Sequence, residues 1–122
     1  MTLFDHFEVH VKDIEKYIEF LKIVFEGGAS KKLTKEGISM FKSPEGIFIE
    51  IKHKKGDKKP ILAGFCQPCL RKKNAKKFIE VNNLNIVDEN ETPNGKVYFF
   101  EDHEGIVWHL KNYLERDWTN NW

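Results

Sequence analysis

Apolar and polar residues alternate at the start of the chain, and the spacing then becomes helical. Within the segment Phe4–Val11, apolar residues at positions 7, 9 and 11 alternate with polar ones, which is typical of a strand with one buried face. Asp13 should then cap a helix, because its carboxylate can accept hydrogen bonds from the free N–H groups of the first turn. Three short apolar runs follow the helix. The elements predicted for this half are a strand at 4–11, a helix between Asp13 and Gly27, and strands at 33–35, 38–42 and 47–53.

The second half of the chain repeats this order of elements. We expect a strand at 61–66, followed by a helix that opens at Cys69 and closes at Asn82-Asn83. Three further apolar runs predict strands at 84–87, 96–101 and 106–113. The pattern therefore predicts one domain made of two βαβββ modules. Module 1 covers about 3–53 and module 2 about 61–113, with a basic linker at 54–60 and a polar tail at 114–122.

One stretch of sequence occurs twice and supports a duplication. Phe41–Ile51 and Phe100–Leu110 each run from an aromatic residue into a polar turn that ends in Glu-Gly, and an Ile then opens an apolar strand. Three residues after that Ile stands a side chain able to bind a metal or move a proton, Glu50 in one copy and His109 in the other. The copies are 59 positions apart, about half the chain, which indicates a duplicated module rather than a solenoid.

Composition narrows the classes of function. A chain of 122 residues is long enough to bury a core, and a net charge of +1 provides no basic field for nucleic acid or an anionic membrane. No apolar run approaches the roughly 18 residues that span a bilayer. Two cysteines, many Lys and Glu residues and no recognisable signal peptide lead us to expect a protein of the reducing cytoplasm. We therefore expect neither a nucleic-acid nor a membrane partner.

Three motifs combine with the paired modules. They are Phe4-Asp5-His6, Gly46-Ile47-Phe48-Ile49-Glu50-Ile51 and Asp102-His103-Glu104-Gly105-Ile106-Val107-Trp108-His109-Leu110. Together they resemble the vicinal oxygen chelate superfamily, which includes glyoxalases, bleomycin resistance proteins and extradiol dioxygenases, over roughly residues 3–113. The resemblance implies an α+β fold whose two βαβββ modules have curled mixed sheets that form a cleft. It also implies a homodimer that binds a small-molecule ligand or substrate.

In proteins of this superfamily four positions, on the first and last strand of each module, can hold a divalent metal. The resemblance maps them to His6, Glu50, Leu62 and His109, of which Leu62 cannot ligate. The remaining two histidines and one carboxylate suit Zn, Ni, Mn or Fe. Strand alternation supports the set, because Glu50 shares one face of its strand with Phe48 and Lys52, as His109 does with Val107 and Lys111. The alternative is a metal-free cleft whose polar residues bind the ligand directly.

Other residues are candidates for chemistry or ligand binding. Glu50 or Glu8 would move a proton in an enzyme. We expect ligand contacts from residues on the cleft faces, namely His10, Phe48, Cys66 and Phe99. The first hypothesis is a protein that binds a small molecule, with or without a metal. The second is a metal-dependent lyase, isomerase or dioxygenase that acts on an oxygen-chelating substrate. The third is a dithiol redox protein that uses Cys66 and Cys69, since a helix N-terminus would lower the pKa of a thiol.

Overall fold

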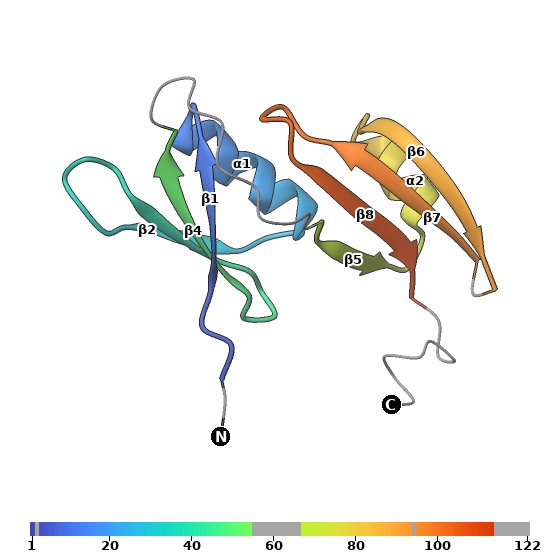
Figure 1. The fold of residues 1–122 in the computed structure, drawn as a ribbon, viewed down its shortest axis with the longest axis horizontal. Helices are drawn as coiled ribbons and strands as arrows, with labels where there is room; N and C mark the ends of the chain where they lie inside the picture. Colours follow the sequence, from blue (N-terminus) through green and yellow to red (C-terminus); the bar gives the residue numbers. More distant parts are fainter. Residues whose placement is uncertain (2, 55–66, 94, 114–122) are drawn as a thin grey trace. The chain divides into compact units, whose positions relative to one another are not determined.

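The computed structural model describes residues 1, 3–54, 67–93 and 95–113 (Figure 1). The chain divides into two compact units, Met1–Pro60 and Ile61–Trp122. Each unit has one four-stranded mixed sheet and one helix in its described part. No helix of the described residues is long and apolar enough to cross a lipid bilayer.

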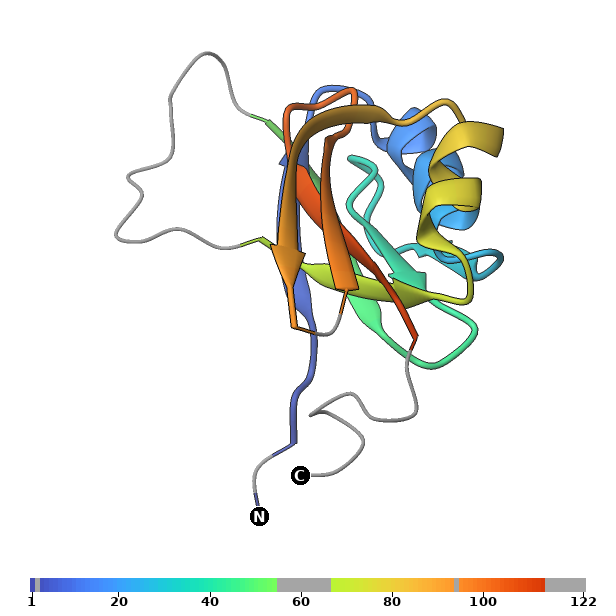
Figure 2. The ribbon, with the colours of Figure 1, turned by 90° about the vertical axis from the view of Figure 1, so that its right-hand side faces the viewer.

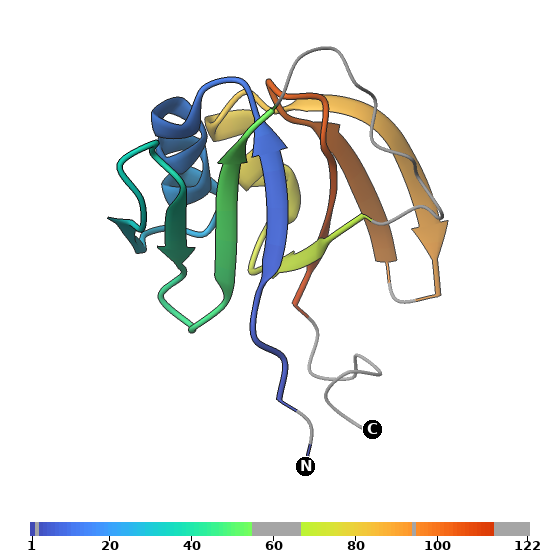
Figure 3. The same ribbon diagram turned by 60° about the vertical axis from the view of Figure 1, so that its left-hand side comes forward.

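The first unit has the predicted order βαβββ. Its sheet has the strand order β1-β4-β3-β2, with β1 parallel to β4 and the other pairs antiparallel. Helix α1 lies across one face of this sheet (Figure 3). The elements are β1 (Phe7–Val11), α1 (Ile14–Val24), β2 (Ala29–Lys32), β3 (Ser39–Lys42) and β4 (Phe48–His53). Asp13 caps α1 as predicted, because its carboxylate accepts from the Lys16 N–H at 3.0 Å.

The second unit repeats this topology. Its sheet has the order β5-β8-β7-β6, again with the first and last strands of the unit parallel and adjacent. Helix α2 packs on β5 and β8, and Figure 2 shows it on one side of the sheet. The elements are β5 (Cys69–Lys72), α2 (Ala75–Val81), β6 (Asn85–Thr92), β7 (Gly95–Glu101) and β8 (Val107–Asn112). The prediction of two βαβββ modules with mixed sheets is confirmed.

Two predicted elements are displaced. The second helix does not open at Cys69, because Cys69–Lys72 forms a strand and Asn74 caps the helix by accepting from the Lys77 N–H at 3.1 Å. The expected strand at 33–35 is replaced by β2 at Ala29–Lys32. Both observed strands carry few apolar residues, so hydrophobic periodicity has little to detect there. The predicted strand at 61–66 and the tail at 114–122 lie outside the described residues.

The alternation of the strands separates a core face from a polar face in each sheet. In the first unit α1 covers Phe41, Ile49 and Ile51, all fully buried, while Phe48 and Glu50 lie on the opposite face. The helix contributes its own apolar stripe to this core: Ile14, Tyr17, Ile18, Leu21 and Val24. In the second unit the buried apolar residues that the structure describes are Ala75, Ile79, Phe100, Trp108 and Leu110. The functional candidates on the described strands therefore lie on the faces that the helices leave uncovered.

Asp102 fixes the turn that leads into β8. It is only 8% exposed, and its Oδ1 accepts from the backbone N–H groups of Glu104 and Ile106 at 2.9 and 3.0 Å. Its Oδ2 accepts from the indole N–H of Trp108 at 3.0 Å. The carboxylate thus joins the turn to the core and sets where β8 starts.

Substitution of Asp102 tests the contribution of these hydrogen bonds to stability. In Asp102→Asn the amide oxygen can keep the two backbone contacts, but the amide nitrogen then faces the Trp108 N–H with a second donor. A buried donor left without an acceptor costs about 1–3 kcal/mol, so we expect that loss in the free energy of unfolding from urea titrations. Ser43→Ala is the matched change in the first unit, where the Ser43 hydroxyl accepts from the Ile47 N–H at 2.9 Å. It should cost about 1 kcal/mol. Equal stability of Asp102→Asn and the parent protein would contradict the assignment.

Candidate functional site

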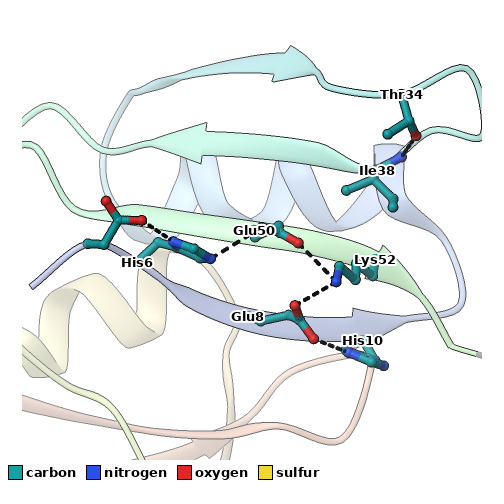
Figure 4. A network of polar contacts seen from close by, with 8 residues as sticks. His6, Glu8, His10, Thr34, Ile38, Glu50 and Lys52 are labelled. Atoms are coloured by element: carbon teal, nitrogen blue, oxygen red, sulfur yellow. Dashed lines mark hydrogen bonds and ion pairs between the residues drawn. The ribbon is translucent and has the colours of Figure 1, made fainter.

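The first unit brings His6 and Glu50 together at the start of β1. His6 directly precedes β1, and its Nε2 lies 3.2 Å from Oε2 of Glu50 on the adjacent parallel strand β4. The other ring nitrogen of His6, Nδ1, contacts the carboxylate of Asp5 (Figure 4). This second contact orients the imidazole so that Nε2 points at Glu50.

Lys52 extends this pair into a network along the same face. Its Nζ lies 3.2 Å from Oε1 of Glu50 and 2.9 Å from Oε1 of Glu8. The second oxygen of Glu8 lies 2.6 Å from Nε2 of His10. Figure 4 shows the five side chains from His6 to His10 following one another along β1 and β4. The structure therefore places four predicted residues, His6, Glu8, His10 and Glu50, in one polar network.

The contacts within this network shift the pKa values of Glu8, His6 and Lys52. Hydrogen bonds from Lys52 and His10 lower the pKa of Glu8 to about 2. The contact with Asp5 raises the pKa of His6, and the contacts with Glu8 and Glu50 raise that of Lys52. A carboxylate with a pKa near 2 is a weak base at neutral pH. The electrostatics therefore disfavour the predicted proton-moving role of Glu8, and that of Glu50 stays a prediction.

The second unit holds a neutral counterpart of this site. Nε2 of His109, on β8, donates to Oε1 of Gln67 at 2.6 Å. The ring of Phe99, on the adjacent strand β7, lies 4.1 Å from the His109 ring between centroids. Burial lowers the pKa of His109. The predicted residues His109 and Phe99 thus lie together, and Gln67 joins them.

Strand pairing shows that the two pairs occupy equivalent places. Glu8 lies opposite Glu50 in the β1–β4 ladder, and Cys69 lies opposite His109 in the β5–β8 ladder. Two residues before Glu8 is His6, and two residues before Cys69 is Gln67. Gln67, rather than Leu62, is therefore the counterpart of His6. The sequence held the signal, because Gln67 precedes the helix cap Asn74 by seven residues, as His6 precedes the cap Asp13.

The remaining predicted site residues belong to neither of these two pairs. Phe48 lies on the polar face of β4, is 37% exposed, and has Nζ of Lys42 5.6 Å from its ring centroid. Cys66 and Leu62 lie outside the described residues. Cys69 is an exposed residue of a strand, so it lacks the helix N-terminus on which the dithiol hypothesis relied.

Comparison with known proteins shows similarity in structure alone. No protein-family profile and no curated protein sequence matches the chain. Among solved structures, the fosfomycin resistance protein FosX from Listeria monocytogenes has a TM-score of 0.70 at 15% identity, over 93% of this chain and 95% of that one. A glyoxylase/bleomycin resistance protein/dioxygenase domain from Frankia sp. EAN1pec has a TM-score of 0.69 at 12% identity, over 96% of each chain. The integron cassette protein VCH_CASS1 from V. cholerae has a TM-score of 0.61 at 16% identity, over 93% of this chain and 97% of that one.

The chain has the vicinal oxygen chelate fold. The predicted resemblance is confirmed at the level of the fold, and the similarity extends over both units. Within the described part of the chain, no group of three or more His, Cys, Asp or Glu side chains is placed to hold a metal ion. The predicted set of His6, Glu50 and His109 takes ligands from both units and stays a prediction.

The pKa values of the two site histidines should lie on opposite sides of the value of an ordinary imidazole, which is about 6.5. A raised pKa at His6 stabilises the fold below pH 6.5, and this contribution is lost as the pH rises through the folded value. A lowered pKa at His109 stabilises the fold above pH 6.5, and this contribution is lost as the pH falls through the folded value. We expect NMR titration of the imidazole ring signals to show His109 taking up its proton at lower pH than His6. His6→Gln and His109→Gln assign the signals, and the reverse order would contradict the assigned environments.

Proposed function

We propose that the protein binds a small molecule with oxygen donors through a divalent metal ion, and that His6, Glu50 and His109 supply ligands to this ion. Gln67 is the candidate fourth ligand. One observation carries the proposal: each unit presents two donor atoms side by side on its uncovered face, Nε2 of His6 with Oε2 of Glu50, and Nε2 of His109 with Oε1 of Gln67.

The spacing within each pair suits neighbouring ligands of one ion. Nitrogen and oxygen ligands lie about 2.1 Å from such a metal, so two of them at right angles are about 3 Å apart. The observed separations are 3.2 Å for His6 and Glu50 and 2.6 Å for His109 and Gln67. Within each pair, the two atoms are therefore already spaced as neighbouring ligands of one ion would be. Metal ligation by His109 Nε2 would require the imidazole proton to sit on Nδ1.

Gln67 removes the main argument against a metal. With Leu62 at the fourth position, one ligand would be replaced by an apolar wall. An amide oxygen at that position is a usable donor for hard divalent cations. The set of two imidazoles, one carboxylate and one amide suits Mn(II), Zn(II), Ni(II) or Fe(II).

A similar solved structure indicates which ligand chemistry to try first. A FosX variant was solved in complex with Mn(II) and 1S,2S-dihydroxypropylphosphonic acid, with 16% identity and a TM-score of 0.68. We therefore propose Mn(II) as the first metal and small diols or phosphonates as the first ligands. Phe48 and Phe99, on the polar faces of their sheets, are the candidate apolar contacts for such a ligand.

The metal would supply Lewis-acid polarisation of a ligand oxygen. The residues of the chain would hold and orient it. The Asp5 carboxylate fixes the His6 ring through Nδ1 and leaves Nε2 for ligation. Lyase, isomerase or dioxygenase activity is the enzymatic alternative, in which Glu50 is the favoured proton-moving group. A homodimer and a cytoplasmic location remain predictions.

Metal-free binding is the second candidate, and a specific observation favours it. Within each pair the donor and acceptor already satisfy each other, so the polar faces are complete without an ion. In that case the same four side chains would hydrogen-bond the ligand directly.

Calorimetric titration of metal-free protein with Mn(II), Zn(II) and Ni(II) separates the two candidates. Mutation of even the outer partners of metal ligands costs roughly 10- to 100-fold in affinity, so we expect His6→Ala and His109→Ala each to weaken binding by at least that factor. His103→Ala removes an exposed imidazole from a turn, and Cys69→Ala removes the thiol, so both should leave the affinity unchanged. A parent protein that binds none of these metals at millimolar concentration would refute the metal proposal and leave the metal-free candidate.

A further inference from the structure

We infer that Lys52, held in place by Glu8, is a positioning residue that turns the Glu50 carboxylate toward His6. The inference rests on the proposed metal site, because it assigns to two residues outside the ligand set the task of preparing one ligand. It names Lys52, which the sequence motifs did not single out.

The contact with Lys52 determines how the Glu50 carboxylate is oriented. Lys52 Nζ lies 3.2 Å from Oε1 of Glu50, and this leaves Oε2 as the oxygen that faces His6. A carboxylate at the end of a flexible Glu side chain loses conformational freedom when one oxygen is held by a cation. Lys52 thus selects which oxygen of Glu50 is offered to a metal.

Glu8 acts one step further away. Its Oε1 lies 2.9 Å from Lys52 Nζ, and its Oε2 lies 2.6 Å from His10 Nε2. A lysine side chain has high rotamer entropy, and a second anchor restricts it further. Glu8 therefore keeps the Lys52 ammonium at Glu50.

The Lys52 ammonium also makes the arrangement electrostatically stable. Glu8 and Glu50 are direct partners in the β1–β4 ladder, and like charges directly opposite each other destabilise a sheet. The ammonium between them offsets this repulsion. Without it, Glu50 would be expected to rotate away from Glu8 and out of its orientation toward His6.

The second unit has the same sheet topology without a counterpart of the Glu8–Lys52 ion pair. Lys111 follows His109 by two residues, as Lys52 follows Glu50, but Cys69 stands at the counterpart of Glu8. The same sheet topology therefore forms with a thiol where the first unit has a carboxylate. The Glu8–Lys52 pair belongs to the chemistry of the first unit rather than to its folding pattern.

The Lys52→Met variant distinguishes the positioning effect of Lys52 on metal affinity from the effect of its charge. Removing a positive charge close to a bound cation would, by electrostatics alone, tighten metal binding. Loss of positioning would weaken it, by the roughly 10- to 100-fold that outer partners of metal ligands typically contribute. We expect weaker Mn(II) binding by calorimetry. Lys52→Arg keeps the charge and the reach, and it should restore most of the affinity.

Two further variants sharpen the test. Glu8→Gln should weaken Mn(II) binding through Lys52, so its effect should not add to that of Lys52→Met in the double variant. Lys96→Met is the matched control, because Lys96 also bridges two glutamates, Glu89 at 3.1 Å and Glu91 at 3.6 Å, at the hairpin of β6 and β7. It should leave the affinity unchanged.

A second measurement needs no metal and keeps this inference distinct from the proposed function. In the metal-free protein, Lys52→Met should change the ¹⁵N chemical shifts of the His6 ring, because the Glu50 oxygen beside Nε2 moves, and Lys96→Met should not. Failure of the parent protein to bind metal would refute the proposed function, while this spectrum still reports on the orientation of Glu50. Unchanged His6 signals in Lys52→Met, or metal binding as tight as or tighter than in the parent protein, would overturn the inference.

Discussion

The parallel pairing of the first and last strands of each unit is the constraint on which the site depends. In a ladder of this kind, side chains of directly paired residues point to the same face, and that face is fixed by which residues the helix buries. Because Ile49 and Ile51 are fully buried under α1, Glu50 must lie on the other face, opposite Glu8. A slip of one residue would send Glu50 into the core. The apolar core thus determines the register, and the register determines which polar groups meet.

The same constraint explains how much the sequence could predict. Alternation of apolar and polar residues was sufficient for β1, β4, β7 and β8, whose buried faces are strongly apolar, and the Asp13 cap located α1. β4 and β8 carry Glu50 and His109, and His6 directly precedes β1, so the polar faces of these strands were predicted correctly. The short strands β2 and β5 were not located, because they are defined by hydrogen bonds to a neighbour rather than by buried side chains. Because β5 was not located, Leu62 instead of Gln67 was assigned as the counterpart of His6.

Lys52 illustrates a different limit of sequence reasoning. Its face could be predicted from the alternation of β4, but its role depends on the cross-strand partner. Glu8 and Glu50 are 42 positions apart in the sequence, and only the pairing of β1 with β4 shows that one ammonium can serve both. Contacts of this kind depend on the register between paired strands. The buried apolar residues set that register, and the surface charges do not.

The two units use one scaffold for opposite electrostatic environments. In the first unit the network is built around a full charge, because the Lys52 ammonium lies within hydrogen-bond distance of both Glu8 and Glu50. In the second unit His109 is partly buried beside Phe99 and is matched by a neutral amide, which suits an uncharged imidazole. A buried cation would be costly there, whereas the more exposed face of the first unit tolerates one. Duplication therefore preserved the strand pairing while the residues at equivalent positions diverged, His6 against Gln67 and Glu8 against Cys69. The face of the first unit therefore offers charged groups, whereas that of the second unit offers a neutral amide and an aromatic ring, so each face suits a different ligand chemistry.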